Sequence, residues 1–189
     1  MHYDIDSIMN MFAITGRVVT LRSRMVPLEN GNCVVVGKII RPSHNYPKAL
    51  VAIIDNDGNT VAVDVCDIDS QYSSEFIDVD INRIDGTIIC VGHECERNTD
   101  DGLIVYGYIA EYQFDLTGRK IYQRITTHPE NPKGALCSLS RVSVSPGTRI
   151  AVAYGDVILS QIGQSNWLRV RLYNGELDGA HYELSTTIK

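Results

Sequence analysis

Short runs of β-branched and other apolar residues, separated by Gly, Asn, Asp and Pro, dominate this sequence. The clearest runs are residues 33–36, 50–54, 60–63, 87–91 and 103–106. Such runs are typical of β-strands, and frequent turn residues between them favour a barrel or a sandwich. The best helical candidates, residues 5–12 and the weaker segment 119–126, lack a convincing apolar period with caps. The sequence therefore predicts an all-β fold.

Two turns have the chemistry of β-hairpins. Asp57-Gly58 lies between two apolar runs, and an Asp-Gly pair supplies the positive φ angles that a tight turn needs. Residues 98–102, which end in Gly102, separate the run that ends at Arg97 from the run that begins at Leu103. We therefore expect two hairpins with loops of different length.

Residues 32–115 have the strand order of a small Greek-key barrel. The expected strands are residues 34–40, 50–55, 60–66, 86–92 and 103–110, with a polar connector between the third and the fourth. Gly37 suits the point where a first strand must coil sharply to serve both halves of a barrel. We predict a closed five-stranded OB-fold barrel.

Alternation along the third expected strand predicts which of its side chains face inward. The valines at alternate positions are expected to fill the interior, and the residues between them to face outward. The inward set is Val61, Val63 and Val65, and the outward set is Thr60, Ala62 and Asp64.

Four regions follow from these patterns. Residues 1–31 form a lead-in that packs on the barrel, residues 32–115 form the OB-fold barrel, residues 116–134 form a connector, and residues 135–189 form a β-rich C-terminal segment. The connector is inferred from Pro129, Pro132 and Gly134. Within the C-terminal segment, residues 167–172 followed by Asn174-Gly175 resemble the end of an SH3-like strand pair.

Composition and charge restrict the class of protein. No apolar run approaches the roughly 18 residues of a membrane helix. Residues 1–12 lack the basic start of a secretory signal, and the five cysteines are odd in number without a CxxC pair. We therefore expect an intracellular protein with reduced thiols.

The charge is unevenly distributed. The formal net charge is −6, with 8 basic and 18 acidic residues up to Asp115, and 9 basic and 5 acidic residues after it. An acidic first part does not suit strong non-specific binding to phosphates.

Six segments carry a resemblance to a known family. They are residues 12–16, 34–41, 53–58, 73–75, 89–93 and 103–106. In their order and spacing they resemble the OB-fold domain of the middle subunit of replication protein A and of the related Stn-like subunit of the telomere-capping CST complex. The resemblance covers about the first 115 residues.

The resemblance implies a function, partners and a location. It implies a non-catalytic OB-fold subunit of a nuclear complex that handles single-stranded DNA in replication, repair or telomere capping, without a cofactor and without membrane contact. Its partners would be single-stranded DNA, a smaller OB-fold protein and other subunits. The chain departs from the family where base-stacking aromatic residues are expected, because Cys66-Asp67 and Glu96-Arg97 stand there.

Candidate DNA-binding residues gather around the expected first loop of the barrel. Cations for phosphate combined with an aromatic ring for a base are typical of single-strand binding. Tyr106 is either a stacking residue or, with Tyr108, part of the barrel packing. The candidate set is Arg22, Arg24, Arg41, His44, Tyr46, Lys48, Arg97 and Tyr106.

A second candidate surface lies in the basic C-terminal part. Trp and Arg are common at interface hot spots, so Trp167, Arg169 and Arg171 are candidates for binding a partner subunit. This surface leads to the alternative function of a structural scaffold subunit that binds little DNA.

The sequence gives little indication of a metal site or of a catalytic site. Cys90, on one side of a strand, cannot join His93 and Cys95 on the other, so we expect no zinc site. A β-barrel hydrolase of chymotrypsin-like architecture is a remote alternative with Cys137 as nucleophile, but the apolar residues 135–139 offer no Gly-rich oxyanion loop. We therefore expect no catalytic residue.

Overall fold

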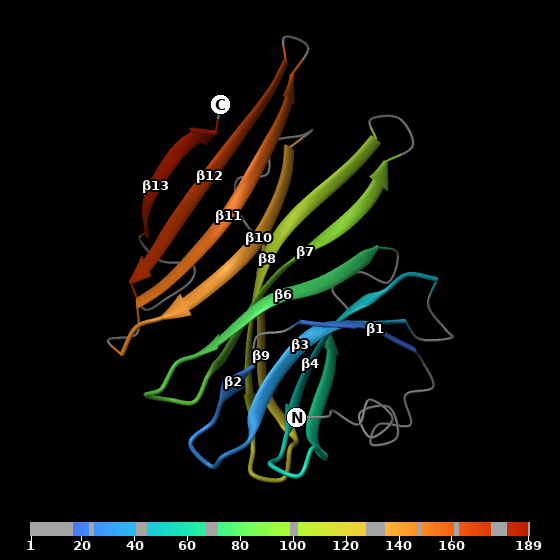
Figure 1. Ribbon diagram of the computed structural model, residues 1–189, viewed down its shortest axis with the longest axis vertical. Helices are drawn as coiled ribbons and strands as arrows, with labels where there is room; N and C mark the ends of the chain where they lie inside the picture. Colours follow the sequence, from blue (N-terminus) through green and yellow to red (C-terminus); the bar gives the residue numbers. More distant parts are fainter. Residues whose placement is uncertain are drawn as a thin grey trace.

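The computed structural model describes residues 17–22, 25–40, 45–66, 72–98, 102–127, 135–146, 149–160, 163–174 and 181–188. All regular secondary structure within these ranges is β-strand, arranged as two sheets (Figure 1). The prediction of an all-β fold is confirmed. The helical candidate at residues 5–12 lies outside the described residues.

The first sheet is built from the N-terminal strands, and all its strand pairs are antiparallel. Its order is β1-β3-β4-β5, with β2 paired to β3 beside β1. The strands are β1 (Arg17–Leu21), β2 (Val26–Pro27), β3 (Cys33–Ile40), β4 (Lys48–Ile54) and β5 (Thr60–Cys66). The expected pairing of residues 34–40 with residues 50–54 is confirmed as the β3–β4 pair.

The second sheet contains the rest of the described chain. Its order is β13-β12-β11-β10-β8-β7-β6, with β9 paired to β8. The strands are β6 (Ser73–Ile81), β7 (Ile88–Asn98), β8 (Gly102–Phe114), β9 (Lys120–Thr127), β10 (Ala135–Val144), β11 (Arg149–Ser160), β12 (Gly163–Asn174) and β13 (His181–Ile188). Apart from one parallel bridge between Leu136 of β10 and Val105 of β8, its pairs are antiparallel.

Two hairpin turns repeat one geometry. Asp55 begins the β4–β5 turn and Asp115 begins the β8–β9 turn, and each carboxylate accepts the backbone N–H groups two and four residues later at 2.7–2.9 Å. Each turn ends through a glycine in the left-handed region, Gly58 with φ 90° and Gly118 with φ 81°. The carboxylate and the glycine together fix both turns because they satisfy the backbone donors and avoid a Cβ clash.

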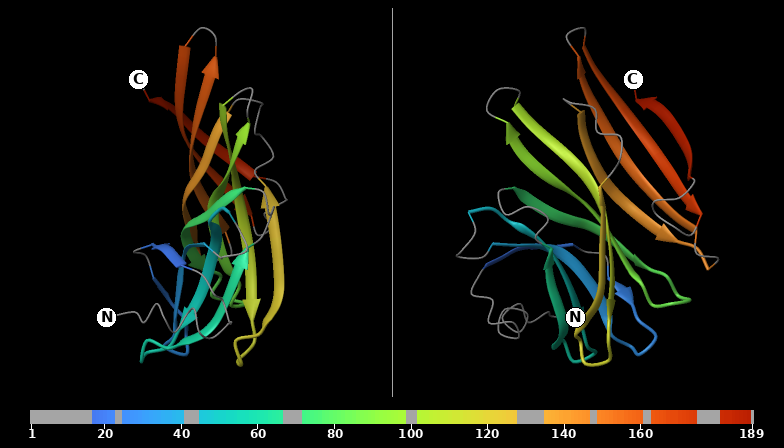
Figure 2. Two further views of the ribbon diagram at one scale, coloured as in Figure 1. Left: turned by 90° about the vertical axis from the view of Figure 1, so that its right-hand side faces the viewer. Right: turned by 180° about the vertical axis from the view of Figure 1, so that it is seen from behind.

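The main core lies between the two sheets. Phe76 of the second sheet packs its ring 5.5 Å from Tyr108 and 6.0 Å from Tyr112, both on β8. The first sheet contributes the buried side chains Val34, Val36, Ala49, Val51, Ile53, Ala62 and Cys66 to the same cluster. Figure 2 shows the first sheet packed against the lower part of the second sheet.

The prediction of a closed five-stranded barrel is wrong for the described residues, because the two sheets do not join into one barrel. Side chains bridge one seam, where Lys120 Nζ of β9 lies 2.8 Å from Asp64 Oδ2 of β5. At the other seam, the Ser74 N–H donates to the Pro47 carbonyl at 2.9 Å, and the Ala49 N–H donates to Ser74 Oγ at 3.0 Å. Side-chain and isolated backbone contacts therefore replace continuous strand pairing.

The sequence predicted connectors at two places where the structure has strands. β6 lies in the stretch predicted as a polar connector, and β9 lies in the predicted connector 116–134 and coincides with the weak helical candidate. The polar residues of β6 do not break the strand because they have partners inside the protein. Glu75 forms ion pairs, and Asp78 and Asp80 accept hydrogen bonds from β10.

The inward and outward assignment on β5 is wrong for Ala62, Val63 and Val65, whereas Val61 packs against the main core as expected. Ala62 lies in the core between the sheets, whereas Val63 belongs to a separate cluster on the other face of the first sheet. That second cluster also contains Val35, Ile39, Leu50, Ala52 and Ile54, all nearly inaccessible to solvent. Alternation could not distinguish the faces because both are apolar and buried.

The C-terminal strands extend the second sheet away from the first (Figure 1). β10 contacts β6 through two hydrogen bonds, from the Val142 N–H to Asp78 Oδ2 at 3.0 Å and from the Val144 N–H to Asp80 Oδ2 at 2.8 Å. A further apolar cluster combines Ile89, Val91, Ile109, Val142, Ile150 and Tyr173. β10 to β13 therefore share a sheet with β7 and β8, and β10, β11 and β12 also share this apolar cluster.

Candidate functional site

The structure describes part of the predicted DNA-binding set. Arg24, Arg41 and His44 lie outside the described residues. Arg97 lies in β7, where its backbone pairs with Leu103 of β8. The remaining four residues, Arg22, Tyr46, Lys48 and Tyr106, have described side chains in different surroundings.

Lys48 is buried at the start of β4. Its Nζ donates a hydrogen bond to the Tyr72 carbonyl oxygen at 2.7 Å. A buried ammonium group held by the protein is not presented to a phosphate, so the geometry gives Lys48 a structural role.

Arg22 belongs to a compact charged cluster where the two sheets meet. Its guanidinium forms an ion pair with Glu75, and Lys38 Nζ lies 2.9 Å from the other oxygen of the same carboxylate. The Glu75 side chain is buried, so it requires these cations as partners. His93 lies directly across from Glu75 on β7, and burial lowers the pKa of His93.

The two tyrosines of the set differ in exposure. Tyr46 precedes β4 and has 48% of its surface exposed, so its ring is accessible to a ligand. Tyr106 is half-buried on β8 opposite Glu94. Its neighbour Tyr108 is buried in the main core, which confirms a packing role for that ring.

The predicted partner-binding residues lie on an interior strand. Trp167, Arg169 and Arg171 belong to β12, which pairs with β11 on one side and β13 on the other. The backbone at these positions is therefore not an open sheet edge. The structure describes the backbone there and not these side chains.

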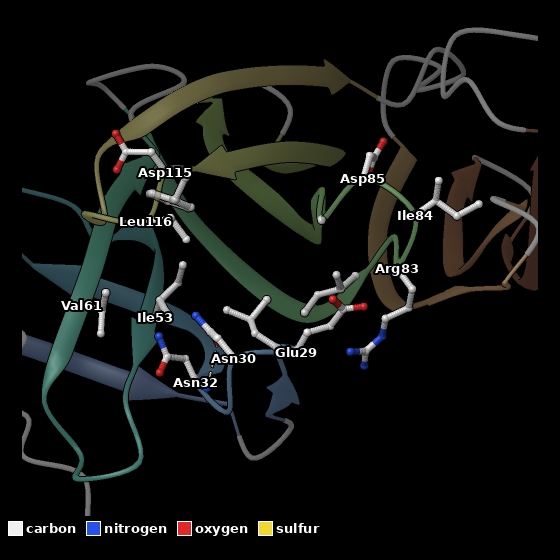
Figure 3. Close-up of a pocket in the computed structure, with 14 residues that line it drawn as sticks. Glu29, Asn30, Asn32, Ile53, Val61, Arg83, Ile84, Asp85, Asp115 and Leu116 are labelled. Carbon is white, nitrogen blue, oxygen red and sulfur yellow. Dashed lines mark hydrogen bonds between the residues drawn. The ribbon is translucent and has the colours of Figure 1, made fainter.

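A pocket that the sequence did not predict opens where the two sheets meet at their turn ends (Figure 3). Its volume is about 410 Å³. The turn between β2 and β3, the turn between β6 and β7, the β8–β9 turn and the strands β4 and β5 all contribute to its wall. The lining residues are Leu28, Glu29, Asn30, Asn32, Ile53, Val61, Ile81, Arg83, Ile84, Asp85, Gly86, Phe114, Asp115 and Leu116.

The pocket combines an apolar interior with an apolar rim. Ile53, Ile81 and Phe114 are core or core-packed side chains, so the pocket opens directly onto the main core. Two rim residues project from turns on opposite sides in Figure 3. They are Ile84, 69% exposed, and Leu116, 97% exposed.

Charged groups at the rim are mainly acidic. Asp85 Oδ1 accepts the Thr87 N–H at 2.9 Å, so this carboxylate also holds its own turn. Hydrogen bonds, above all from the Thr117 hydroxyl, lower the pKa of Asp115. Glu29 adds a third carboxylate, and the one cation of the lining, Arg83, donates to the Pro27 carbonyl at 2.7 Å.

The ionisable groups of the pocket lining are carboxylates and one guanidinium group. Among the described residues that line the pocket there is no Cys, His, Ser or Lys, and the candidate acid–base groups are Glu29, Asp85 and Asp115. No group of three or more His, Cys, Asp or Glu in the described ranges is placed to hold a metal ion. In the same part of the chain, no helix is long and apolar enough to span a membrane.

No protein-family model matches this chain, and no curated protein matches its sequence significantly. The function is therefore inferred from the sequence and from the geometry of its residues.

Proposed function

We propose that the chain is a non-catalytic scaffold subunit that binds other proteins, in a nuclear complex that handles single-stranded DNA. The observation that carries the scaffold role is the use of the predicted DNA-binding cations inside the protein. Lys48 is bound to the Tyr72 carbonyl, and Arg22 is bound to Glu75 together with Lys38.

The energetic cost of redirecting these cations to DNA is high. A phosphate that attracted Arg22 and Lys38 would leave the buried Glu75 carboxylate without its partners. Glu75 is buried while Arg22 and Lys38 are partly exposed, so the cost lies below the roughly 3–5 kcal/mol of a fully buried pair and above the roughly 0–1 kcal/mol of a surface pair. An exposed phosphate contact returns less than this, so the resting arrangement disfavours a DNA site on this cluster.

The assignment to a DNA-handling complex is supported by the sequence resemblance. We propose that β3 to β8 form a diverged OB fold. The ion pair between Lys120 of the following strand β9 and Asp64 of β5 stands where a closed barrel would have strand pairing. An OB fold that has lost closure and stacking residues would still position partner subunits. A smaller OB-fold protein is the partner that the resemblance implies.

Oligonucleotide binding by the isolated chain tests the scaffold role. We expect a fluorescein-labelled oligo(dT) to bind with a dissociation constant of about 1 µM or weaker at physiological salt, the range of non-specific binding. Fluorescence anisotropy between about 50 and 200 mM salt measures both the affinity and its salt slope. Nanomolar binding without any partner would show that the chain is itself the DNA-binding subunit.

Co-purification tests membership of the complex. Tagged protein expressed with candidate OB-fold subunits should co-elute with one of them in a defined ratio during size-exclusion chromatography. A chain that stays monomeric with every such candidate, and binds no DNA, would contradict the assignment.

Direct binding of single-stranded DNA is the second candidate function. One specific observation favours it, the exposure of the Tyr46 ring beside the first sheet. A stacked base on an aromatic ring is worth about 1–3 kcal/mol, so a single exposed tyrosine supports weak binding.

A further inference from the structure

We infer that the pocket and its rim, defined by the lining residues given above, form the docking site for a short basic segment of a partner protein that inserts one bulky apolar side chain. This inference rests on the proposed scaffold function and names its partner surface. It places that surface at the turn ends of β6–β7 and β8–β9 instead of on β12.

The size of the pocket fits a side chain of a partner. Its volume of about 410 Å³ lies near the lower end of the roughly 300–1,000 Å³ typical of ligand pockets. The space admits a bulky apolar side chain but not a folded element. Interface hot spots commonly consist of one such anchor in a desolvated pocket, surrounded by weaker contacts.

The rim supplies the surrounding apolar contacts. In the described part of the chain, five large apolar side chains are exposed, and two of them, Ile84 and Leu116, line this pocket. Exposed apolar groups that gather around a concavity mark an interaction site more strongly than the same groups scattered singly.

The net charge of the rim determines which partner segments it attracts. Glu29, Asp85 and Asp115 outnumber Arg83, so the rim is net negative at neutral pH. Such a rim attracts Lys and Arg beside the apolar anchor and repels phosphates, fatty-acid carboxylates and acidic peptides. A nucleic-acid strand is therefore disfavoured at this pocket.

The walls of the pocket are held in place before any partner arrives. The Leu28 N–H donates to the Asn32 carbonyl at 2.7 Å, the Asn82 N–H to the Thr87 carbonyl at 2.8 Å, and the Asp115 N–H to the Arg119 carbonyl at 2.9 Å. Preorganised turns reduce the ordering cost of binding. The site can therefore accept a short, weakly structured segment.

Two matched peptides test the proposal on the full chain. Acetyl-GKLFKG-amide carries the expected basic flanks, and acetyl-GELFEG-amide has the same apolar centre with acidic flanks. We would titrate each into ¹⁵N-labelled protein and follow backbone NMR shifts. We expect the basic peptide to bind at least about threefold more tightly at low salt, with less difference at high salt because salt screens rim charges.

Substitutions at exposed positions test whether the peptide binds at the pocket or elsewhere on the surface. Ile84→Ser and Leu116→Ser should each weaken binding of the basic peptide several-fold with unchanged unfolding midpoints, because both side chains are exposed. Ile121→Ser is the matched control, since Ile121 is 60% exposed and does not line the pocket. Glu29→Gln should reduce the preference for the basic peptide.

Three results would overturn the inference. They are equal affinity for both peptides at low salt, shifts located away from the lining residues, and no binding of either peptide at millimolar concentration. None of these results depends on oligonucleotide binding. Failure of the pocket and failure of the scaffold proposal can therefore be told apart.

Discussion

The carboxylate of Asp78 accepts a hydrogen bond at 3.0 Å from the backbone N–H of Val142, which lies 64 positions later in the chain. Asp80 makes the same contact with the Val144 N–H two residues further along both strands. The spacing of two residues on each strand means that one face of β6 presents carboxylates to the backbone of β10. These contacts attach the C-terminal strands to the second sheet beside its apolar cluster.

Replacement of Asp78 by Ala should destabilise the protein. The buried Val142 N–H would lose its acceptor, and an unsatisfied buried donor costs about 1–3 kcal/mol. Asp78→Asn should cost less because its amide oxygen can still accept the bond. Urea unfolding of the two variants measures the difference. Equal stability of Asp78→Ala and the unchanged protein would show that the contact contributes nothing.

Two glycine substitutions should separate backbone strain from steric clash. Gly86 and Gly118 both have positive φ, 73° and 81°. A Cβ at Gly118 would lie 2.0 Å from the Val61 carbonyl oxygen, whereas a Cβ at Gly86 meets nothing within 4 Å. Gly86→Ala should therefore cost about 1–2 kcal/mol from the left-handed backbone alone, and Gly118→Ala should cost clearly more. Similar losses of thermal stability would contradict the close approach of the β8–β9 turn to β5.

The cysteines should differ in their reaction with N-ethylmaleimide. Burial raises the pKa of Cys66 to about 11 and that of Cys90 well above its usual value. Burial also raises the pKa of Cys95, which is only half-buried. Because the thiolate is the reactive form, half-buried Cys33 should be labelled first near neutral pH, followed by Cys95 and then by the two buried cysteines. Peptide mapping by mass spectrometry measures the order, with urea-unfolded protein as the control. Labelling of Cys66 as fast as Cys95 in folded protein would contradict its burial.

Stability should fall in acid through the two turn carboxylates. Hydrogen bonds lower the pKa of Asp55, chiefly from the Asn59 side chain, and of Asp115, chiefly from the Thr117 hydroxyl. The unfolded chain therefore binds protons at a higher pH, so this stabilisation is complete above the unfolded pKa of about 3.9 and disappears as the pH falls through the folded pKa. In an Asp55→Asn, Asp115→Asn double variant, the melting temperature should fall less steeply with decreasing pH than in the unchanged protein. An identical slope of melting temperature against pH in the two proteins would refute this.

Tyr46 distinguishes the two candidate functions. If the loop before β4 binds single-stranded DNA, Tyr46→Ala should weaken oligo(dT) binding by about 1–3 kcal/mol, the worth of one stacked base. The scaffold function predicts no change. Tyr122→Ala provides a control, because Tyr122 is also exposed, at 41%, but lies on β9. Anisotropy at fixed salt measures both variants.

The sequence predicted the fold where local chemistry was sufficient. The runs that became β3, β4, β5 and β7 are apolar and bounded by turn residues, and Asp57-Gly58 identified the β4–β5 hairpin. β6 was missed because its acidic residues suggest a solvated connector. The partners that allow those acids to be buried lie directly after β1, on β3 and on β10, far away in the chain.

The candidate site was less predictable than the fold. The pocket exists because separate turns converge, and no single turn carries a sign of it. The local sequence did indicate the rim of the pocket at Ile84 and Leu116. Each is a large apolar residue next to an aspartate in a tight turn, where its side chain is exposed and does not pack in the core. Conversely, Lys48 is held by the carbonyl of Tyr72, which lies outside the expected first loop of the barrel.

The long sequence separation of the Asp78–Val142 contact also sets an order of events during synthesis. At about 5–20 residues per second, the ribosome needs several seconds to proceed from residue 78 to residue 142. Throughout that interval Asp78 and Asp80 have no β10 backbone to bind and must be hydrated, so the face of β6 that later contacts β10 has to stay accessible to water. The second sheet is therefore completed late, and the nascent chain is exposed to association with other chains until β10 has emerged.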